Sequence, residues 1–560
     1  MLLLSGPVRI FHGRQLAPRE FVNLGADDTG TAGGRVLAVY PATDGLPTKL
    51  LRQLVDAQLD ALLPQITDPL PASVLAAAGV PLLADALRLV HRPGSVKEAE
   101  RGRARLAFEE LFCVQLLHRR ANQLERSERD GITFVNRRKL TTALKQLLPF
   151  TLTGAQVRVL REIVADMTSH QRMHRLLQGD VGSGKTVVAA LAATRAIDAG
   201  WQCALMAPTE ILAEQHFRKL VGWLAPLGLT IAWLTGSRKG KSRDAMVAQV
   251  ASGQAMLVVG THAVIQRDVV FARLGLAIVD EQHRFGVAQR LALREKLDTH
   301  ALEPHLLMMT ATPIPRTLAM SYFADLDVST IDELPPGRTP VLTKVFADGK
   351  RAEVVQRVRA ELAGRAGSQV YWVCPLVEES EHLDLQNATA THAELAAALP
   401  GVSVGLLHGR MKAADKAAVM AQFTSGEMRL LVATTVIEVG VDVPAASLMV
   451  IEHAERFGLA QLHQLRGRVG RGAAASVCVL LYTPPLSSTG KARLKAMAQT
   501  SDGFEIARRD LDIRGPGEFM GARQSGDALL RFADLQQDNA LLQAARTLAP
   551  QLLRDHPAAA

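Results

Sequence analysis

Short apolar runs alternate with longer amphipathic stretches through the middle of the chain. The first series of runs covers residues 175–178, 203–207, 256–259, 276–279 and 305–309. The second series covers residues 369–374, 402–407, 430–433, 448–451 and 477–481. Short apolar runs between helical segments are typical of parallel strands that are buried on both faces of a sheet. The pattern therefore predicts two α/β domains in tandem, with a linker rich in proline and glycine between them at residues 332–340.

The N-terminal part of the chain shows two other patterns. Residues 8–11 and 36–40 are the strand candidates of a small sheet, which is marginal by itself. From residue 50 to about residue 145, apolar positions recur with the period of a helix. One helical face is formed by Leu51, Leu54, Val55, Leu59 and Leu62. We therefore expect a small sheet and then a helical region before the first α/β domain.

The composition is that of an ordinary globular protein, with 48% hydrophobic and 21% charged residues in a chain of 560. The four cysteines lie far apart and form no CxxC pair, which argues against a disulfide framework or a zinc site. The apolar run at residues 1–4 is too short for a signal peptide, and no stretch approaches the roughly 18 apolar residues of a membrane span. We therefore expect a soluble protein of a reducing compartment, the cytoplasm.

The charge balance permits a polyanionic partner, because the net charge is +9 and the isoelectric point is about 9.5. Between residues 88 and 145 there are 14 Lys and Arg residues against 7 Asp and Glu residues. This excess has two interpretations. It forms either the solvated faces of helices or a track for a phosphate backbone.

A phosphate-binding loop follows the first predicted strand of the tandem domains. Residues 179–186 read GDVGSGKT, which matches G-x-x-x-x-G-K-T between an apolar run and a helical run. Glycines let backbone N–H groups close around phosphate oxygens, and the N-terminus of the following helix adds positive potential. Lys185 is expected to reach the β- and γ-phosphates of ATP, and Thr186 to supply a hydroxyl to Mg²⁺. The predicted nucleotide-binding residues of the loop are Gly179, Asp180, Val181, Gly182, Ser183, Gly184, Lys185 and Thr186.

An acidic pair comes directly after the run at residues 276–279. Asp280 is expected to hold Mg²⁺, and Glu281 is expected to orient and activate the attacking water. The pair is informative because it follows a complete phosphate-binding loop. His283 has two interpretations, as a residue that couples hydrolysis to movement or as a structural histidine.

The second α/β domain carries a basic turn, since residues 464–471 read QLRGRVGR. Arg468 and Arg471 lie three residues apart between glycines, so both can face the phosphates held by a neighbouring domain. They are therefore candidate arginine fingers that neutralise charge in the transition state. The alternative is a solvated basic turn.

These motifs, in this order, resemble those of superfamily 2 helicases, and longer segments resemble the RecG branch. The segments read MAPTEILAEQH (206–216), DEQHRFG (280–286), MTATPIPRT (309–317), IDELPPGR (331–338), ATTVIEVGVD (433–442) and IRGPGE (513–518). Residues 39–45 (VYPATDG) extend the likeness upstream of the motor, so that it covers roughly residues 35 to 545. The resemblance implies an ATP-dependent double-stranded DNA translocase that remodels branched DNA, regressing stalled replication forks and migrating Holliday junctions in recombination and repair.

The resemblance also implies roles for residues at matching positions. Gln156 would contact adenine. The cleft between the motor domains would contain Gly440 and Asp442. Hydrolysis would be coupled to domain closure by Gln282, His283, Thr310, Thr312 and Gln464. A hairpin that moves along duplex DNA would use Arg493, Arg514 and Gln524. A monomeric state, a place in the bacterial cytoplasm beside the nucleoid and a single-strand-binding protein as partner follow from the same resemblance, which implies no membrane partner.

The expected fold class is α/β, with two tandem RecA-like parallel-sheet domains. The five expected regions are a partial oligonucleotide-binding (OB) wedge at 1–48, a helical region at 49–145, an ATP-binding domain at 146–335, a helicase C-terminal domain at 336–486 and a hairpin domain at 487–560. Family members begin with a helical segment and a complete barrel, whose earlier strands have no counterpart here, and a five-stranded barrel cannot close without them. Either Met1 is a misplaced start or the wedge is incomplete.

Three alternatives remain at this point. A transcription-repair coupling factor shares the motor and hairpin but needs a polymerase-binding module, which nothing in this sequence resembles. An RNA helicase of the DEAD class would carry Asp-Glu-Ala-Asp where this chain has DEQH at residues 280–283. A DNA-binding scaffold with an inactive phosphate-binding loop would be expected to lack Lys185, Glu281 or an arginine finger, and all are present. A DNA-binding scaffold whose junction unwinding is impaired because its wedge is truncated stays open.

Overall fold

The computed structural model describes most of the chain, and it divides that chain into two compact units. The described residues are all those outside 1, 6–7, 11–13, 17–19, 24–35, 37, 42–45, 129–130, 238–239, 282–301, 313–325, 336–339, 366, 376–380, 435–442, 471–474, 515–529, 535–536 and 556–560. Only the backbone is described at 2–5, 8–10, 14–16, 20–23, 49, 118, 121–128, 381–386, 413 and 514. Unit 1 comprises residues 1–120 and 524–560, and unit 2 comprises residues 121–523.

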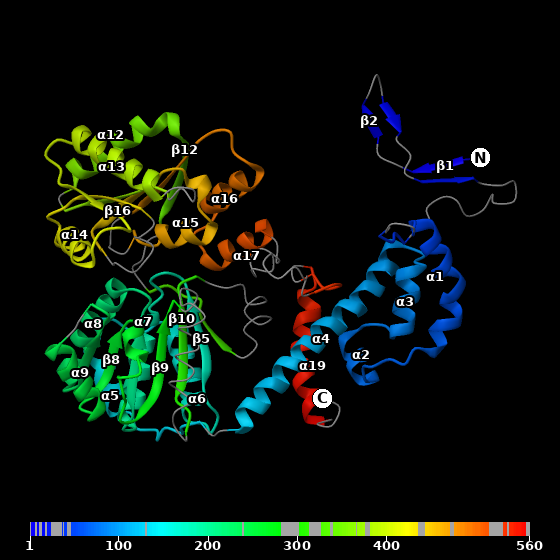
Figure 1. Cartoon of the computed structure of the whole chain (residues 1–560), viewed down its shortest axis with the longest axis horizontal. Coiled ribbons are helices and arrows are strands. Elements are labelled where there is room, and N and C mark those ends of the chain that lie inside the picture. The colour runs from blue at the N-terminus through cyan, green and yellow to red at the C-terminus, as the bar shows by residue number, and fades with distance from the viewer. Residues whose placement is uncertain are drawn as a thin grey trace. The chain divides into compact units, whose positions relative to one another are not determined.

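Unit 1 is mainly helical, as its sequence pattern predicts. Its helices are α1 (Thr48–Leu62), α2 (Ala72–Ala78), α3 (Leu83–His91), the first part of α4 (Val96–Glu128) and α19 (Asn539–Asp555), with a 3₁₀ turn η1 (Leu63–Gln65). Gly79 ends α2 with a φ of 68°, a left-handed conformation that glycine adopts without strain. The last described helix, α19, packs against α2 (Figure 1).

Two antiparallel strand pairs precede these helices. They are β1 (Leu2–Ser5) with β4 (Glu20–Asn23), and β2 (Val8–Ile10) with β3 (Arg14–Leu16). The strand predicted at residues 8–11 is thus confirmed by β2. The strand predicted at residues 36–40 is wrong in its described part, because residues 36 and 38–40 have no regular structure.

An ion pair and several hydrogen bonds join the C-terminal segment of unit 1 to α4. The guanidinium group of Arg103 donates to both carboxylate oxygens of Asp538, at 2.7 and 2.8 Å. The carboxylate of Glu110 accepts the backbone N–H groups of Arg531, Phe532 and Ala533, at 2.6 to 2.9 Å. The segment that leads into α19 is therefore held on α4 by ionised groups as well as by packing.

The first motor domain of unit 2 contains, among its described residues, a parallel sheet of seven strands in the order β11-β5-β10-β9-β6-β8-β7. The strands are β5 (His174–Gly179), β6 (Gln202–Met206), β7 (Thr230–Leu234), β8 (Ala255–Gly260), β9 (Leu274–Asp280), β10 (His305–Thr310) and β11 (Asp327–Ile331). The helical elements are α5 (Lys139–Leu147), α6 (Gly154–Met167), α7 (Lys185–Asp198), α8 (Glu210–Leu224), η2 (Ala225–Leu227), α9 (Lys241–Ala251) and η3 (His262–Ile265).

The second motor domain contains, within the part described, a parallel sheet of six strands in the order β12-β17-β16-β13-β15-β14. The strands are β12 (Leu342–Ala347), β13 (Gln369–Val373), β14 (Val404–Leu407), β15 (Leu430–Ala433), β16 (Ala446–Ile451) and β17 (Val477–Tyr482). The helical elements are η5 (Asp348–Lys350), α12 (Arg351–Gly364), α13 (Glu381–Ala398), α14 (Ala413–Ser425), η7 (Ala454–Arg456), α15 (Leu459–Arg466), α16 (Ser488–Gln499) and α17 (Gly503–Arg514). The predicted pair of parallel-sheet domains is confirmed.

Both sheets bury their two faces in separate cores, which explains the uninterrupted apolar runs of the sequence. In β5, Leu177 packs into the core beneath α6 and α7, whereas its neighbour Leu176 packs into the core on the α9 side. Successive strand residues point to opposite faces, so a sheet covered on both sides needs apolar residues at every position. The same alternation divides β13, where Tyr371 and Trp372 enter different cores.

Within the described ranges, no single helix is both long and apolar enough to cross a membrane. The pair α2 and α3, which meet at a bend of 51°, passes that test by length and composition when taken together.

Candidate functional site

The phosphate-binding loop joins β5 to α7, at the carboxyl edge of the first sheet, as its sequence predicts. Gly182 and Gly184 have φ values of 79° and 89°, which an L side chain rarely adopts. A Cβ atom at Gly184 would also overlap the side-chain amide of Gln156. Glycine is therefore required at position 184 both by the backbone and by the lack of space, and the loop can place its N–H groups around an anion.

Lys185 lies at the first position of α7 and folds over the loop. Its Nζ atom donates to the carbonyl oxygens of Gly179 and Asp180, at 2.8 and 2.9 Å. Thr186 follows in the same turn and is half-buried. An ammonium group, a hydroxyl and the first N–H groups of a helix thus share one place, which is the set that phosphate oxygens require.

Gln156 lies directly behind this loop, on the first turn of α6, and only 2% of its surface is exposed. Its Oε1 atom accepts the N–H of Thr153 at 3.0 Å, while the Thr153 hydroxyl accepts the N–H of Gln156 at 3.2 Å. This reciprocal arrangement caps α6. The Nε2 atom of Gln156 donates to the carbonyl of Ser183 at 2.8 Å, so one amide ties the loop to the helix. Its predicted contact with adenine stays a prediction.

Asp280 ends β9, beside the phosphate-binding loop, with 7% of its surface exposed. Nε2 of His216, from α8, lies 2.7 Å from Oδ2 of Asp280, and the N–H of Glu281 donates to Oδ1 at 3.1 Å. Burial alone would raise the pKa of Asp280, but the bond from His216 and the nearby Lys185 outweigh it and lower that pKa. Asp280 is therefore held as a carboxylate. The sequence analysis gave His216 no role.

Glu281 is linked to the segment that follows the neighbouring strand β10. Its backbone is left-handed, with a φ of 51°, and its N–H donates to the carbonyl of Met309 at 2.9 Å. Its Oε1 atom accepts the N–H of Ala311 at 3.3 Å, and the hydroxyls of Thr310 and Thr312 lie 2.9 Å apart. The structure therefore brings the predicted catalytic glutamate together with the two predicted coupling threonines.

The basic turn of the second motor domain lies against the phosphate-binding loop. A Cβ atom at Gly467 would lie 2.7 Å from Cβ of Val181, so Gly467 packs on the side chain of Val181 with no room for a side chain of its own. Arg468 is the next residue and is half-buried, and Gln464 is 4% exposed on α15. The predicted juxtaposition of this turn with the loop is thus present in unit 2.

A second contact between these segments escaped the sequence analysis. Nε2 of His463, on α15, lies 2.5 Å from Oδ1 of Asp180, and both side chains are largely buried. Burial alone would raise the pKa of Asp180, but the bond from His463 and the nearby Lys185 lower it below its ordinary value. A histidine directly before the basic turn was the available signal, and a lone histidine is weak evidence for a contact.

The structure describes the remaining predicted residues only in part. Outside the described residues are Gln282, His283, Gly440, Asp442, Arg471 and Gln524. Arg493 lies half-buried on α16, and Arg514 is the last residue of α17, described by its backbone alone. The two consecutive helices α16 and α17 pack against each other as a helical hairpin, and the role that the resemblance gives this segment on DNA stays a prediction.

The donor set around the loop fits a magnesium ion bound together with a nucleotide. Among the described residues, no group of three or more His, Cys, Asp or Glu side chains is placed to hold a metal by itself. Mg²⁺ does not need such a group, because it binds through one or two protein oxygens, phosphates and waters. The ionised carboxylate of Asp280, next to a loop that carries a threonine hydroxyl, meets this requirement.

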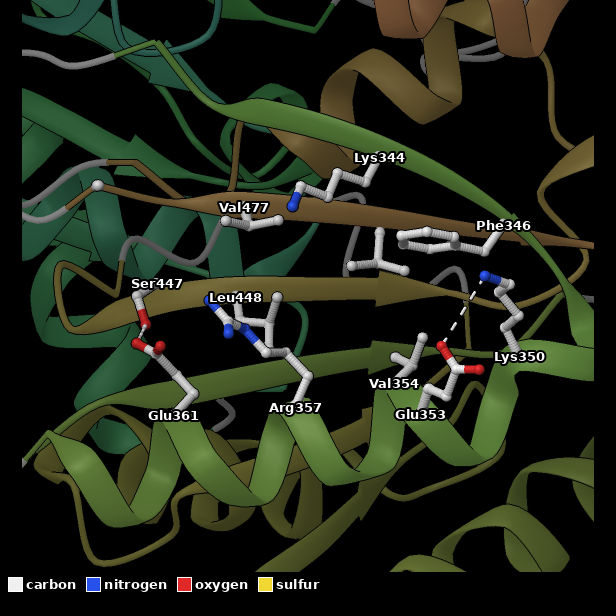
Figure 2. Close-up of a pocket in the computed structure, with 12 residues that line it drawn as sticks. Lys344, Phe346, Lys350, Glu353, Val354, Arg357, Glu361, Ser447, Leu448 and Val477 are labelled. Atoms are coloured by element: carbon white, nitrogen blue, oxygen red, sulfur yellow. Dashed lines mark hydrogen bonds and ion pairs between the residues drawn. The ribbon is translucent and has the colours of Figure 1, made fainter.

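A separate pocket of about 280 Å³ lies on the second motor domain, between α12 and the strands β12, β17 and β16 (Figure 2). Its walls include Phe346, Leu448 and Val477. Lys350 pairs with Glu353 at 4.0 Å. The pocket contains none of the residues predicted for nucleotide or DNA, so its volume does not locate the site.

Family models match three parts of the chain. A DEAD/DEAH box helicase model matches residues 153–321, and a helicase conserved C-terminal domain model matches residues 353–473. A model described as ATP-dependent DNA helicase RecG, domain 3, C-terminal, matches residues 500–560. The first two matches fall within the two parallel-sheet domains, and the third includes α17 and the residues after it.

Relatives of known name match almost the whole chain. The ATP-dependent DNA helicase RecG of Escherichia coli K12 is 51% identical over 98% of this chain and 79% of its own length. The RecG of Acidithiobacillus ferridurans is 52% identical over 93% of this chain and 75% of its own length. A solved structure of RecG bound to a three-way DNA junction matches with a TM-score of 0.69 and 39% identity, over 96% of this chain and 70% of that one.

Proposed function

Because the chain belongs to the RecG family of ATP-dependent DNA helicases, we propose that it is a motor that uses ATP hydrolysis to move along duplex DNA and to remodel branched DNA. Its substrates in this proposal are stalled replication forks and Holliday junctions, in recombination and repair. The RecG of known structure was bound to a three-way junction, which supports branched DNA as the substrate.

One observation supports the nucleotide chemistry most directly, namely the contact of the Gly467 turn with the loop at Val181. Since Arg468 follows Gly467 in this turn, we infer that Arg468 and Arg471 would stabilise the negative charge that develops on the γ-phosphate. Lys185 would bind the β- and γ-phosphates. The glutamate at 281 would orient the attacking water and accept its proton, from a position fixed by the Ala311 N–H.

Mg²⁺ would be held by Thr186 and Asp280, and when bound it neutralises charge on the phosphates. Asp280 is suited to this role because His216 and Lys185 keep it ionised. Gln156 would contact adenine. Gly440 and Asp442 would line the cleft, and residues that transmit its closure would include Gln282, His283, Thr310, Thr312 and Gln464.

Movement along DNA would depend on the hairpin of α16 and α17 and the segment after it. In this role Arg493, Arg514 and Gln524 would contribute to the step that hydrolysis drives. Backbone contacts dominate tracking of this kind, so binding should weaken steeply with salt and show little sequence preference. A monomeric state, a single-strand-binding protein as partner and a place beside the bacterial nucleoid are further parts of the proposal that rest on the family.

Two substitutions test the proposal. Lys185→Ala should abolish ATP hydrolysis while binding to branched DNA, measured by gel shift, is retained. Wild-type turnover in that variant would contradict the nucleotide site. Arg514→Ala should keep ATP hydrolysis while the unwinding of a Holliday junction falls, and unchanged unwinding in a gel assay would contradict the role of the hairpin.

A further inference from the structure

Three segments of unit 2 that are far apart in the sequence meet at the side chain of Asp180. They are the phosphate-binding loop itself, the helix α15 and the first residue of α17. Nε2 of His463 lies 2.5 Å from Oδ1 of Asp180, and only 4% of the surface of His463 is exposed. An ionised group buried in this way is stable only when it is hydrogen-bonded, so the pair is held together strongly.

The direction of these hydrogen bonds follows from Arg466. Its Nη2 atom lies 2.9 Å from Nδ1 of His463, and a guanidinium group can only donate. Nδ1 of His463 is therefore an acceptor, so the ring proton of the neutral imidazole is on Nε2 and is donated to Asp180. The result is a chain of hydrogen bonds that runs from Arg466 through His463 to Asp180, with one donor and one acceptor at each step.

The same arginine reaches the end of α16. Arg466 is 3% exposed, and its Nη1 atom donates to the carbonyl oxygens of Met497 and Thr500, at 3.1 and 2.8 Å. These carbonyls lie in the last turn of α16 and at the residue that ends it. The chain of hydrogen bonds therefore connects the phosphate-binding loop to the turn between the two hairpin helices.

The start of α17 packs on the pair directly. A Cβ atom at Gly503 would lie 2.7 Å from Nε2 of His463 and 3.1 Å from Oδ1 of Asp180, so no side chain fits there. The positive end of this twelve-residue helix also faces the carboxylate, which favours the ionised form of Asp180. Both hairpin helices are thus fixed to the same buried pair, one through Arg466 and one by contact.

Asp180 is in addition the residue whose carbonyl accepts a hydrogen bond from Lys185, at 2.9 Å. A phosphate that draws Lys185 toward itself would weaken this hydrogen bond. The forces on Asp180, whose side chain His463 holds, would then change. One residue of the loop is therefore linked through its backbone to the phosphate-binding lysine and through its side chain to the hairpin.

We propose that His463 is a positioning residue that transmits the state of the phosphate-binding loop to the hairpin of α16 and α17. The inference rests on the proposed function and deepens it, because it assigns the link between the nucleotide site and the part that moves along DNA. His463 touches neither nucleotide nor DNA in this role. It acts by holding Asp180, Arg466 and the start of α17 in one arrangement.

Two variants of His463 separate this role from a structural one. His463→Ala should lower ATP hydrolysis stimulated by a three-way DNA junction by roughly tenfold, since a hydrogen bond to an ionised group contributes about this much to an equilibrium. Hydrolysis without DNA and the KM for ATP should change by less than about twofold, because no group that binds ATP is removed. His463→Gln should recover most of the stimulated rate, because an amide can also accept from Arg466 through its oxygen and donate to Asp180 through its nitrogen.

Gly503→Ala tests the same arrangement without removing a polar group. The added methyl group must displace His463 or Asp180, so the stimulated rate should fall as it does in His463→Ala. His392→Ala is the matched control. His392 lies in the same motor domain, on α13, with its Nε2 atom 3.1 Å from the carbonyl of Val404, and its loss should leave the stimulated rate unchanged.

The outcomes distinguish the two proposals. Lack of stimulation by branched DNA in the unmodified protein would overturn the proposed function and the inference with it. Normal stimulation in the unmodified protein together with equal stimulation in His463→Ala, or in Gly503→Ala, would overturn the inference alone. A loss in His463→Ala that His463→Gln does not reverse, with thermal unfolding of both variants lowered equally, would assign His463 a structural role and would also overturn the inference.

Discussion

Replacing Gln156 by alanine removes two buried hydrogen bonds that hold the phosphate-binding loop on α6. The Oε1 atom of Gln156 accepts the N–H of Thr153 at 3.0 Å, and its Nε2 atom donates to the carbonyl of Ser183 at 2.8 Å. The side chain is 2% exposed, so water does not replace either partner at once. The substitution therefore leaves one donor and one acceptor of the backbone unsatisfied behind the loop.

The expected magnitude follows from the number of these bonds. Each neutral hydrogen bond contributes about 1 kcal/mol net, so two lost bonds cost about 2 kcal/mol. If most of this cost, about 1.4 kcal/mol, falls on the loop in its binding conformation, the KM for ATP should rise by about tenfold, since 1.4 kcal/mol corresponds to a factor of ten. The loss should apply to ATP and GTP alike, because the Ser183 carbonyl belongs to the phosphate-binding loop.

A contact with adenine adds a second, separable effect. An amide has two donors and two acceptor positions, and the bonds to Thr153 and Ser183 use one of each, so one of each remains for a base. If Gln156 also reads adenine, Gln156→Ala should lower the preference for ATP over GTP in addition to weakening both. Nucleotide titrations followed by steady-state hydrolysis measure the two effects on the same samples.

Gln156→Glu and Gln254→Ala complete the test. Glutamate keeps an acceptor for Thr153 but places a carboxylate oxygen against the Ser183 carbonyl, so its effect on KM should equal or exceed that of alanine. Gln254 is exposed after α9, and its loss should change nothing. An unchanged KM in both variants of Gln156 would refute the argument that this amide supports the loop.

Three further predictions concern other parts of the molecule. Glu281→Gln should lower kcat by a factor of about 10² to 10⁴ with nucleotide affinity retained. The oxygen of the glutamine can still accept the N–H of Ala311, but the side chain can no longer act as a base. Single-turnover hydrolysis measures the loss in rate, and a normal rate would exclude Glu281 as the base. Burial lowers the pKa of His305 to about 4, against 6.5 for a free histidine. Between these two pH values the folded state therefore binds fewer protons than the unfolded state. The free energy of unfolding should decrease by about 3 kcal/mol as the pH falls from 6.5 to 4. Urea midpoints of the unmodified protein and His305→Gln over this range measure the decrease, and equal slopes would contradict it. Arg103→Ala leaves the buried carboxylate of Asp538 without its guanidinium partner and should destabilise the C-terminal segment by about 2 kcal/mol. This loss should appear as faster proteolysis between α17 and α19. An unchanged cleavage rate would show that the packing of α19 alone holds the segment.

In the N-terminal part the sequence analysis missed the short strands β1, β3 and β4, and in the two seven- and six-stranded sheets the strands that it missed share a position. The apolar runs located the inner strands and one edge strand, β14, whereas β7, β11 and β12 were not predicted. All three lie at an edge of their sheet. An edge strand has fewer covering neighbours, so polar residues such as Lys344 of β12 and Asp327 of β11 are tolerated and interrupt the run. The missing signal is thus a consequence of partial exposure.

Some residues of the site could be predicted from the sequence and others could not. The phosphate-binding loop and the acidic pair could be predicted because their chemistry depends on residues that are neighbours in the sequence, with glycines and a lysine at fixed spacing. The hydrogen-bond partners of the carboxylates of Asp180 and Asp280 could not be predicted. His216 is 64 residues from Asp280, and His463 is 283 residues from Asp180, and each pair exists only because a parallel sheet and a second domain bring its members together. A buried carboxylate next to a phosphate site needs a hydrogen-bond donor from another part of the fold. The sequence shows that such a donor is needed, but it does not show which residue provides it. The residues that connect hydrolysis to movement are expected among such partners, because a connection between distant segments cannot be made by residues of one segment alone.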